Sequence, residues 1–173
     1  KLPYCDEAYD IFRKGGLAAS ELAAYLNEHF PHKIERLDPV VRARVHGAEQ
    51  ISSVEYLRRR SVLKRCGAGA TQPFGDIDVL LSPTVPITPP RLADIAEVST
   101  YGPTNMMALR NTVISNLFGW CALTMPVGFD ANRMPVGLQL MAPPQAEERL
   151  IDIALSIESL IGTGFDLLGT TSI

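Results

Sequence analysis

The apolar run Ile77–Thr84, with the sequence IDVLLSPT, constrains the fold of this chain more than any other stretch. Apolar residues follow one another almost without interruption between Asp76 and Pro83, which is typical of a strand buried on both faces. Two later segments, CALTMPV and PVGLQLMA, predict two more strands rich in apolar residues. A sheet of about three such strands leaves apolar edges open to pairing. We therefore expect further strands to come from outside this chain.

The last two predicted strands share a doubled MPVG motif, at Met125–Gly128 and Met134–Gly137. A phosphate-binding loop needs GxGxxG or GxxxxGK[ST] before a helix, and neither pattern is present. The connecting stretch FDANR contains Asp130 and Asn132, residue types that favour turns. We interpret the first motif as the end of one strand and the second as the start of the next.

Residues that start or stop helices set the other boundaries. Asp38-Pro39 combines an N-cap with a proline at the first helical position, and Ser52 with Glu55 forms a capping box. The sequence GAGA is expected to end the fourth helix, and residues 85–103, rich in proline, predict a long surface loop. The predicted helices are Asp6–Lys14, Leu17–Phe30, Val40–His46, Ser52–Cys66, Thr104–Leu117 and Ala146–Ile161.

This order of elements predicts an α/β protein whose β-sheet strands are flanked by helices. Residues 1–70 are expected to be helical, and residues 71–173 to combine strands and helices within a single portion of a domain. The 173 residues suffice for a hydrophobic core.

Composition narrows the function classes. With 46% apolar residues, 20% charged residues and a net charge of −3, the chain offers no electrostatic case for nucleic acid or an anionic membrane. The basic run Leu57–Arg65 spreads around its helix and is interpreted as a solvated face. No apolar run approaches the roughly 18 residues of a membrane span, and the start KLPYCDEAYD does not resemble a signal peptide. Cys5, Cys66 and Cys121 lack CxxC spacing, which favours a reducing cytoplasm.

No catalytic constellation stands out from residue types alone. The histidines His29, His32 and His46 lack further ligands at suitable spacing, so no metal or cofactor is expected. GxSxG is absent, and serines 52 and 53 are explained by capping. Cys121 follows Trp120 at the start of an apolar strand, where a buried cysteine acts as a small hydrophobe. A thiol nucleophile at Cys121 is the weaker alternative.

Several motifs, in this order, resemble the C-terminal part of the amidase signature hydrolases. The resemblance covers most of the chain and implies that family's fold, with a mixed sheet flanked by helices. Its motifs are the strand Asp78–Thr84, the residues Arg110, Thr112, Asn116, Leu117 and Gly119, the pair Pro126 and Gly128, the set Pro135, Gly137 and Gln139, and a glutamate near a helix start at Glu147 or Glu148.

The resemblance implies amide hydrolysis by a Lys–Ser–Ser triad that this chain does not contain. A GGSSGG-like run is missing, and none of the lysines has the family's catalytic context. No catalytic residue is therefore assigned here. We expect the chain to form scaffold and one wall of the acyl pocket, with the N-terminal, catalytic portion of an amidase as its partner and a small amide as substrate.

The same resemblance suggests four substrate-binding candidates, Arg44, Asn116, Trp120 and Cys121. Arg44 lies near a family arginine that can meet a substrate carboxylate, and Cys121 stands where the family usually has proline. Leu109 stands where family members that use glutamine as amidotransferases have an acid that holds its ammonium, which argues against glutamine as substrate. The alternative function is a non-catalytic binding or assembly module that docks through its sheet edge, and a homo-oligomer is left open.

Overall fold

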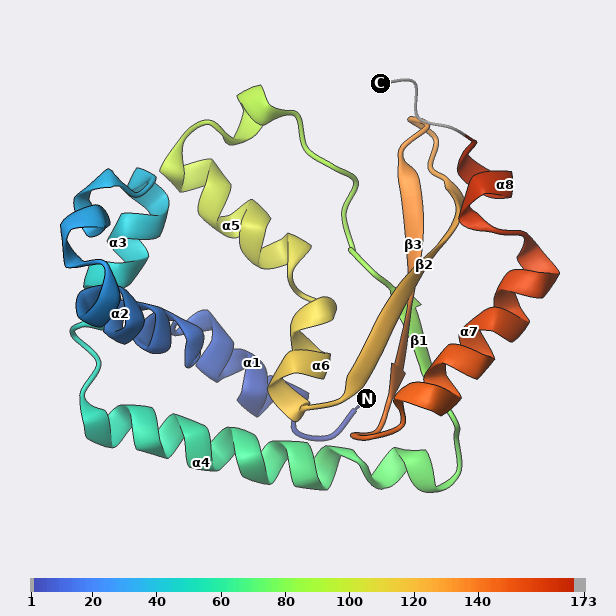
Figure 1. Ribbon diagram of the computed structural model, residues 1–173, viewed down its shortest axis with the longest axis horizontal. Coiled ribbons are helices and arrows are strands. Elements are labelled where there is room, and N and C mark those ends of the chain that lie inside the picture. The colour runs from blue at the N-terminus through green and yellow to red at the C-terminus, as the bar shows by residue number, and fades with distance from the viewer. Residues whose placement is uncertain (1, 170–173) are drawn as a thin grey trace. The chain divides into compact units, whose positions relative to one another are not determined.

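The structure of the chain is a computed structural model that describes residues 2–169. The chain divides into two compact units, Lys1–Gly69 and Ala70–Ile173. The first unit is built from helices, whereas the second combines a sheet with helices (Figure 1).

The helices of the first unit begin close to the positions that local signals predict. Asp38 caps its helix as expected, because its side chain accepts a hydrogen bond of 2.9 Å from the Val40 amide. A small core joins buried side chains from three of these segments, namely Ala23, Ile34, Val45 and Ala48. The elements are α1 (Cys5–Arg13), α2 (Ala18–His29), the 3₁₀-helix η1 (Pro31–Arg36), α3 (Pro39–Ala48) and α4 (Ser53–Ala70).

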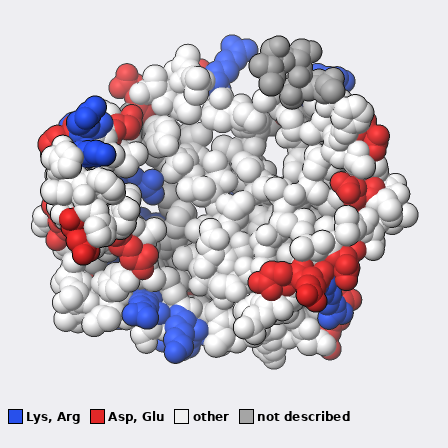
Figure 2. All heavy atoms as spheres, in the orientation of Figure 1, with Lys and Arg blue, Asp and Glu red and all other residues white. Residues whose placement is uncertain are grey.

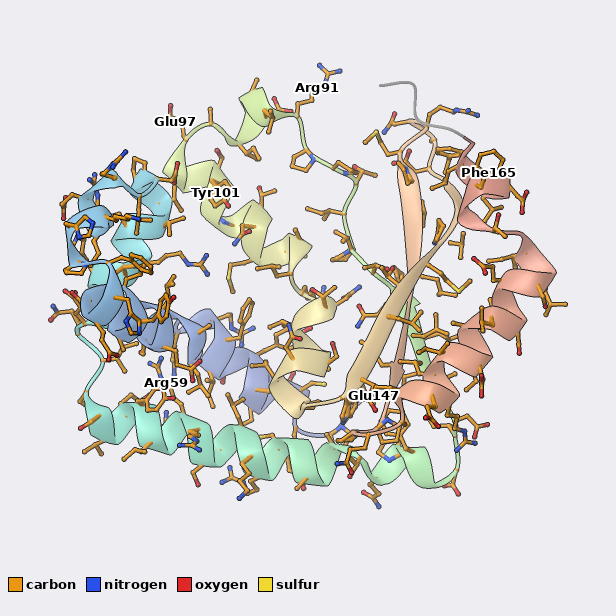
Figure 3. The ribbon with its side chains drawn as sticks, in the orientation of Figure 1. Arg59, Arg91, Glu97, Tyr101, Glu147 and Phe165 are labelled. Atoms are coloured by element: carbon orange, nitrogen blue, oxygen red, sulfur yellow. The ribbon has the colours of Figure 1, made fainter. Side chains whose placement is uncertain are left out.

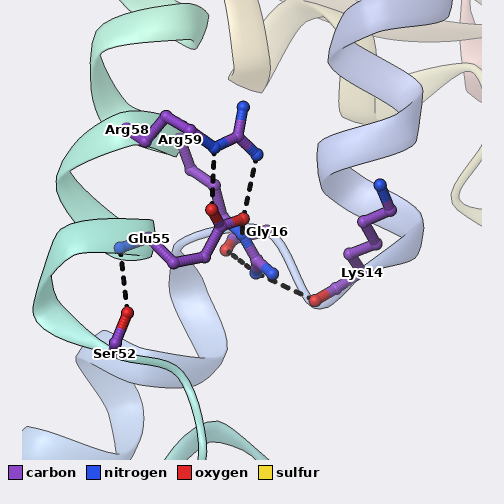
Figure 4. Close-up of polar contacts among 6 residues, drawn as sticks. All are labelled: Lys14, Gly16, Ser52, Glu55, Arg58 and Arg59. Carbon is purple, nitrogen blue, oxygen red and sulfur yellow. Dashed lines mark hydrogen bonds and ion pairs between the residues drawn. The ribbon is translucent and has the colours of Figure 1, made fainter.

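Arg59 on α4 corrects the interpretation of the basic run as a solvated face. Its neighbours Arg58 and Arg60 are exposed, but Arg59 is only 7% exposed. Its guanidinium donates hydrogen bonds of 2.9 and 3.2 Å to the carbonyls of Lys14 and Gly16, just after the end of α1 (Figure 4). Carbonyls at a helix end lack partners inside the helix, so Arg59 is held inside by the acceptors it satisfies.

Glu55 completes this network and only half fulfils the predicted capping box. Its amide donates to the Ser52 hydroxyl at 3.1 Å, as expected. Its carboxylate is directed to Arg58 and Arg59, with bonds of 2.7 to 2.9 Å (Figure 4). Hydrogen bonds from Arg58 and then Arg59 lower the pKa of Glu55 to about 2.

The helix α4 runs through the GAGA sequence to Ala70, so the predicted end at Cys66 is wrong. Gly69 instead permits a close approach within the first unit. A Cβ atom on Gly69 would lie 2.4 Å from the Tyr4 ring, so glycine stands there to admit an aromatic side chain rather than to stop the helix.

The second unit contains β1 (Leu80–Pro83), β2 (Cys121–Phe129) and β3 (Pro135–Ala142), which form an antiparallel sheet in the order β1-β3-β2. Figure 1 shows α7 on one side of this sheet and α5 and α6 on the other. The predicted α/β class, with strands flanked by helices, is confirmed. The helices are η2 (Gln72–Gly75), η3 (Leu92–Ile95), α5 (Val98–Ala108), α6 (Thr112–Phe118), α7 (Glu147–Ile161) and α8 (Gly164–Leu168).

Two predictions about the middle of the chain are wrong. The expected loop at residues 85–103 contains η3 and the start of α5, which includes Pro103 in its interior. Two threonine hydroxyls bond to main-chain carbonyls there: Thr100 donates to the Glu97 carbonyl at 3.0 Å, and Thr104 donates to the Thr100 carbonyl at 2.8 Å. The expected helix Thr104–Leu117 is split into α5 and α6, and α6 ends at Gly119 in the left-handed conformation, near the predicted end.

The strand predictions hold better for β2 and β3 than for β1. β1 is shorter than expected and not buried on both faces, because it lies at the edge of the described sheet and leaves Leu81 54% exposed. β2 continues past its Pro-x-Gly segment to Phe129 through a bulge between Pro126 and Gly128. The turn that follows is confirmed, since the Asp130 carboxylate accepts bonds of 2.8 Å from the amides of Asn132 and Met134.

Candidate functional site

The sheet of the second unit has one apolar face, which α7 covers. Buried side chains from β2, β3 and α7 form its core, and Leu140 is fully buried within it. Cys121 packs against this cluster from the start of β2. The cluster comprises Met125, Leu140, Ala142 and Leu150, with Val79, Leu123, Leu138, Ile153, Ala154 and Ile157 packed around it.

The opposite face carries a row of polar side chains that runs across the three strands. Ser82 on β1 pairs with Gln139 on β3, and Gln139 pairs with Thr124 on β2. Side chains alternate between the faces of a strand, so this row points away from Leu140 and α7. It therefore faces the side on which Figure 1 shows α6.

Gln139 is the most deeply buried polar residue of this row, at 2% exposure. Neither its amide oxygen nor its amide nitrogen has a hydrogen-bond partner within residues 2–169, and the same holds for the Ser82 hydroxyl. Leaving a buried polar group unsatisfied costs about 1–3 kcal/mol. The row thus contains hydrogen-bonding capacity that the described residues do not use.

Next to this row, two threonines converge over a glycine. The Thr84 and Thr124 hydroxyls hydrogen-bond to each other, and the Thr84 amide donates to the Gly137 carbonyl at 2.9 Å. A Cβ on Gly137 would lie 2.7 Å from the Thr84 hydroxyl and 2.9 Å from the Thr124 hydroxyl. Glycine at this position lets β1, β2 and β3 bring their polar side chains together.

A cavity of about 330 Å³ adjoins the glycine end of this face. The proline-rich segment after β1 forms most of its wall, and the start of β3 forms another part. Asp130 also lines it, and one of its carboxylate oxygens is buried without a partner in the part of the chain that the structure describes. The lining residues are Val85, Pro86, Ile87, Thr88, Pro89, Pro90, Ala108, Asp130, Pro135, Val136 and Gly137.

The predicted site residues of the second unit cluster where α6 leads into β2, but their side chains diverge. Asn116 is exposed on α6. Trp120 is buried between the rings of Phe74 and Phe118, with centroid distances of 4.9 and 5.0 Å. Cys121 belongs to the apolar face under α7, so it does not join the polar row.

Arg44, the fourth predicted site residue, is exposed on α3 in the first unit. The first unit also contains a thiol with an altered pKa. Burial, and then the Glu7 carboxylate 3.5 Å away, raise the pKa of Cys66 to about 11. Cys66 therefore stays protonated at neutral pH and is not an activated nucleophile.

The polar row is a site that sequence reasoning missed. In the sequence, Gln139 stands out only as part of a Pro-x-Gly-x-Gln motif, and Ser82 and Thr124 only as members of predicted strands. The signal available was one polar residue within each of two apolar strand segments, the glutamine of GLQLM and the serine of LLSP. Nothing local distinguishes such a residue from one that faces solvent, since its burial depends on the packing of distant segments.

Charged side chains of the second unit gather elsewhere. Figure 2 shows acidic side chains over the N-terminal part of α7. Glu147, labelled in Figure 3, and Glu148 lie in the first turn of this helix, where they complement its dipole. Arg149 forms an ion pair with Asp78 beside them. The row of Ser82, Gln139 and Thr124 is by contrast composed of neutral side chains.

The structure also bears on metals and membranes. Within residues 2–169, no group of three or more His, Cys, Asp or Glu side chains could hold a metal ion. None of the described helices has the length and apolar character needed to cross a bilayer.

A family model described as Amidase matches residues 3–151. The chain belongs to the amidase family. It is similar to the 2-amino-5-chloromuconic acid deaminase of Comamonas testosteroni, with 76% identity over 168 residues, which is 97% of this chain and 36% of the deaminase. It is 31% identical over 130 residues to the fatty acid amide hydrolase of Medicago truncatula, covering 70% of this chain and 21% of that hydrolase.

Solved structures agree with this amidase fold. A crystal structure of an amidase superposes with a TM-score of 0.79 at 20% identity, over 94% of this chain and 37% of that protein. The allophanate hydrolase of Kluyveromyces lactis gives a TM-score of 0.80 at 20% identity, over 99% of this chain and 28% of that protein.

The chain spans 36% of the length of the Comamonas testosteroni deaminase and 21% of the length of the Medicago truncatula fatty acid amide hydrolase. The family and fold predicted from the motifs are therefore confirmed, as is the prediction that this chain corresponds to a portion of an amidase-family hydrolase.

Proposed function

We propose that this chain supplies scaffold and one wall of the acyl pocket of an amidase-family hydrolase that breaks a carbon–nitrogen bond in a small substrate. The observation that carries this proposal is the 76% identity, over 97% of this chain, with a deaminase. The N-terminal portion of such an enzyme contributes the lysine base and the serines. The chain alone is not catalytic.

The name of the relative suggests the substrate class. 2-Amino-5-chloromuconic acid is an unsaturated amino dicarboxylic acid, and a deaminase releases its nitrogen as ammonia. Leu109, at the C-terminal end of α5, supports a substrate other than glutamine, because its side chain cannot hold an ammonium group. Arg44 is our candidate for a substrate carboxylate, and Asn116, Trp120 and Cys121 are our candidates for positions near the acyl pocket.

The geometry of the second unit suits a scaffold role. The apolar cluster under α7 fixes β2 and β3 on one face, which leaves the other face for recognition. Asn111, just before α6, donates a hydrogen bond of 2.7 Å to the Pro83 carbonyl and ties that segment to the end of β1. Segments that would surround a pocket are thus held by contacts distant in sequence.

The test compares this chain with a full-length amidase that contains it. We expect the full-length enzyme, and not the 173-residue chain, to release ammonia from 2-amino-5-chloromuconic acid. Arg44→Met should raise KM by a larger factor than it lowers kcat. Arg36→Met, at an exposed arginine of the same unit, is the control. Turnover by the chain alone that is abolished by a mutation within it would overturn the proposal, as would a full-length enzyme inactive on this acid and on small amides.

We also propose a cytoplasmic setting, which Cys66 and Cys121 support, because neither forms a disulfide within residues 2–169. The oligomeric state of the full-length enzyme, measured by light scattering, decides whether a second copy is part of the assembly.

A further inference from the structure

The orphaned amide of Gln139 and hydroxyl of Ser82 point to a partner beyond the described residues. The two residues are direct cross-strand neighbours, whose Cβ atoms lie about 4.5–5.5 Å apart in such pairs. Yet neither polar group has a hydrogen-bond partner within residues 2–169. An apolar residue in place of Gln139 would avoid the cost of burying an unsatisfied carboxamide. A glutamine at this position is therefore favourable only when a group from outside the described residues forms hydrogen bonds with its carboxamide.

The chemistry of the row narrows what that group can be. Ser82, Gln139 and Thr124 are all neutral, so the row contains no counter-charge for an ion. A carboxamide presents one acceptor oxygen and an N–H donor side by side. This arrangement complements a peptide group, which carries one N–H and one C=O.

The burial of Gln139 indicates that its partner binds while the sheet folds. Gln139 is 2% exposed, so a small solute that diffuses to the finished surface does not reach its amide. A chain segment that folds together with this sheet can displace the side chains that cover it. Such a segment is available, because the chain spans only 36% of the deaminase it resembles.

We propose that Gln139 and Ser82 hold a main-chain peptide group from the portion of the amidase that this chain lacks. Gln139 is then a positioning residue: it acts on that segment rather than on substrate. The proposal rests on the proposed function, since it requires that portion of the enzyme. Thr124 has a different role, because its hydroxyl already bonds to Thr84 and lies 3.3 Å from the Leu138 carbonyl.

The experiment measures hydrogen exchange in the full-length enzyme and in its Gln139→Met variant, which keeps the volume and removes both polar atoms. We expect about five- to tenfold faster exchange in one segment outside this chain, as the loss of a hydrogen bond predicts. Gln139→Glu keeps acceptors but loses the N–H donors, and it should also speed hydrogen exchange in that same segment. Gln50→Met, the same change at an exposed glutamine in the turn after α3, should leave it unchanged.

Unchanged exchange outside this chain, or changes confined to β1–β3, would overturn the proposal. If Gln139→Met fails to fold, Ser82→Ala applies the same criterion, because it removes only one hydroxyl. Exchange is read without turnover, so an enzyme that is inactive on 2-amino-5-chloromuconic acid refutes the substrate proposal and leaves this result interpretable.

Discussion

Arg59 in the first unit and Gln139 in the second are both buried polar side chains, but only one is satisfied. Arg59, 7% exposed, donates to the Glu55 carboxylate and to two main-chain carbonyls. The side-chain amide of Gln139, a residue that is 2% exposed, has no hydrogen-bond partner among residues 2–169. The first unit therefore accounts for its buried charge with its own atoms, whereas the sheet of the second unit presents a carboxamide that its own atoms do not satisfy.

The proposed role of Gln139 rests on this difference between the two side chains. Buried polar groups in folded proteins are nearly always hydrogen-bonded. A satisfied network such as that of Arg59 is a device of internal stability. An unsatisfied pair such as Ser82 and Gln139 is expected to find its hydrogen-bond partner outside the described residues.

The largest effect is expected at Arg59. Arg59→Met should lower the free energy of unfolding by about 2–4 kcal/mol, because the carbonyls of Lys14 and Gly16 lose their donor. Urea denaturation followed by circular dichroism measures the change. Arg60→Met, on the exposed side of the same helix, should stay within about 0.5 kcal/mol. Equal effects of the two changes would mean that the hydrogen bonds of Arg59 do not stabilise the chain.

Gly137→Ala should have the next largest effect, a loss of about 1–3 kcal/mol. The added Cβ meets the Thr84 and Thr124 hydroxyls at 2.7 and 2.9 Å, and threonine is stiff about χ1, so the strands themselves must move. Thermal unfolding measures it against Gly75→Ala, where an added Cβ meets nothing within 4 Å. A stable Gly137→Ala variant would show that the polar face tolerates displacement.

A smaller, pH-dependent effect is expected from Glu55. Its pKa falls from 4.5 to about 2 in the folded chain, so its stabilising contribution is complete above pH 4.5 and is lost as pH falls toward 2. The stability difference between the native chain and Glu55→Gln should therefore shrink across that range. Denaturant midpoints measured from pH 6 down to about pH 2.5 test this, and a constant difference would contradict it.

The smallest loss of stability in the chain itself is expected at Gln139. Gln139→Met should not lower the unfolding free energy of the isolated chain, since no hydrogen bond of this side chain to the described residues is lost and the cost of burying an unsatisfied carboxamide is removed. The same urea titration as for Arg59 makes the comparison direct. A loss above about 2 kcal/mol would mean that Gln139 is satisfied within this chain.

Local signals predicted the elements whose causes are local. Asp38 caps α3 through an amide two residues away, and the Asp130 turn is held by bonds within four residues. The start of α7 at Glu147 and the end of α6 at Gly119 follow equally short-range rules. The ordered motifs also predicted the amidase family, which the comparisons confirm. The roles of Arg44, Asn116, Trp120 and Cys121 stay predictions.

Tertiary packing decided the features that depend on distant residues. Gly69 leaves room for the Tyr4 ring within α4, and Arg59 is buried where the end of α1 offers it carbonyls. Gln139 lies between Ser82 and Thr124 because β3 pairs with both β1 and β2, and β1 is distant in the sequence. The sequence by itself determined the elements and the family, because capping, turns and motif order act over a few residues. Burial and hydrogen-bond satisfaction are set by contacts between distant segments, so only the tertiary structure decided them.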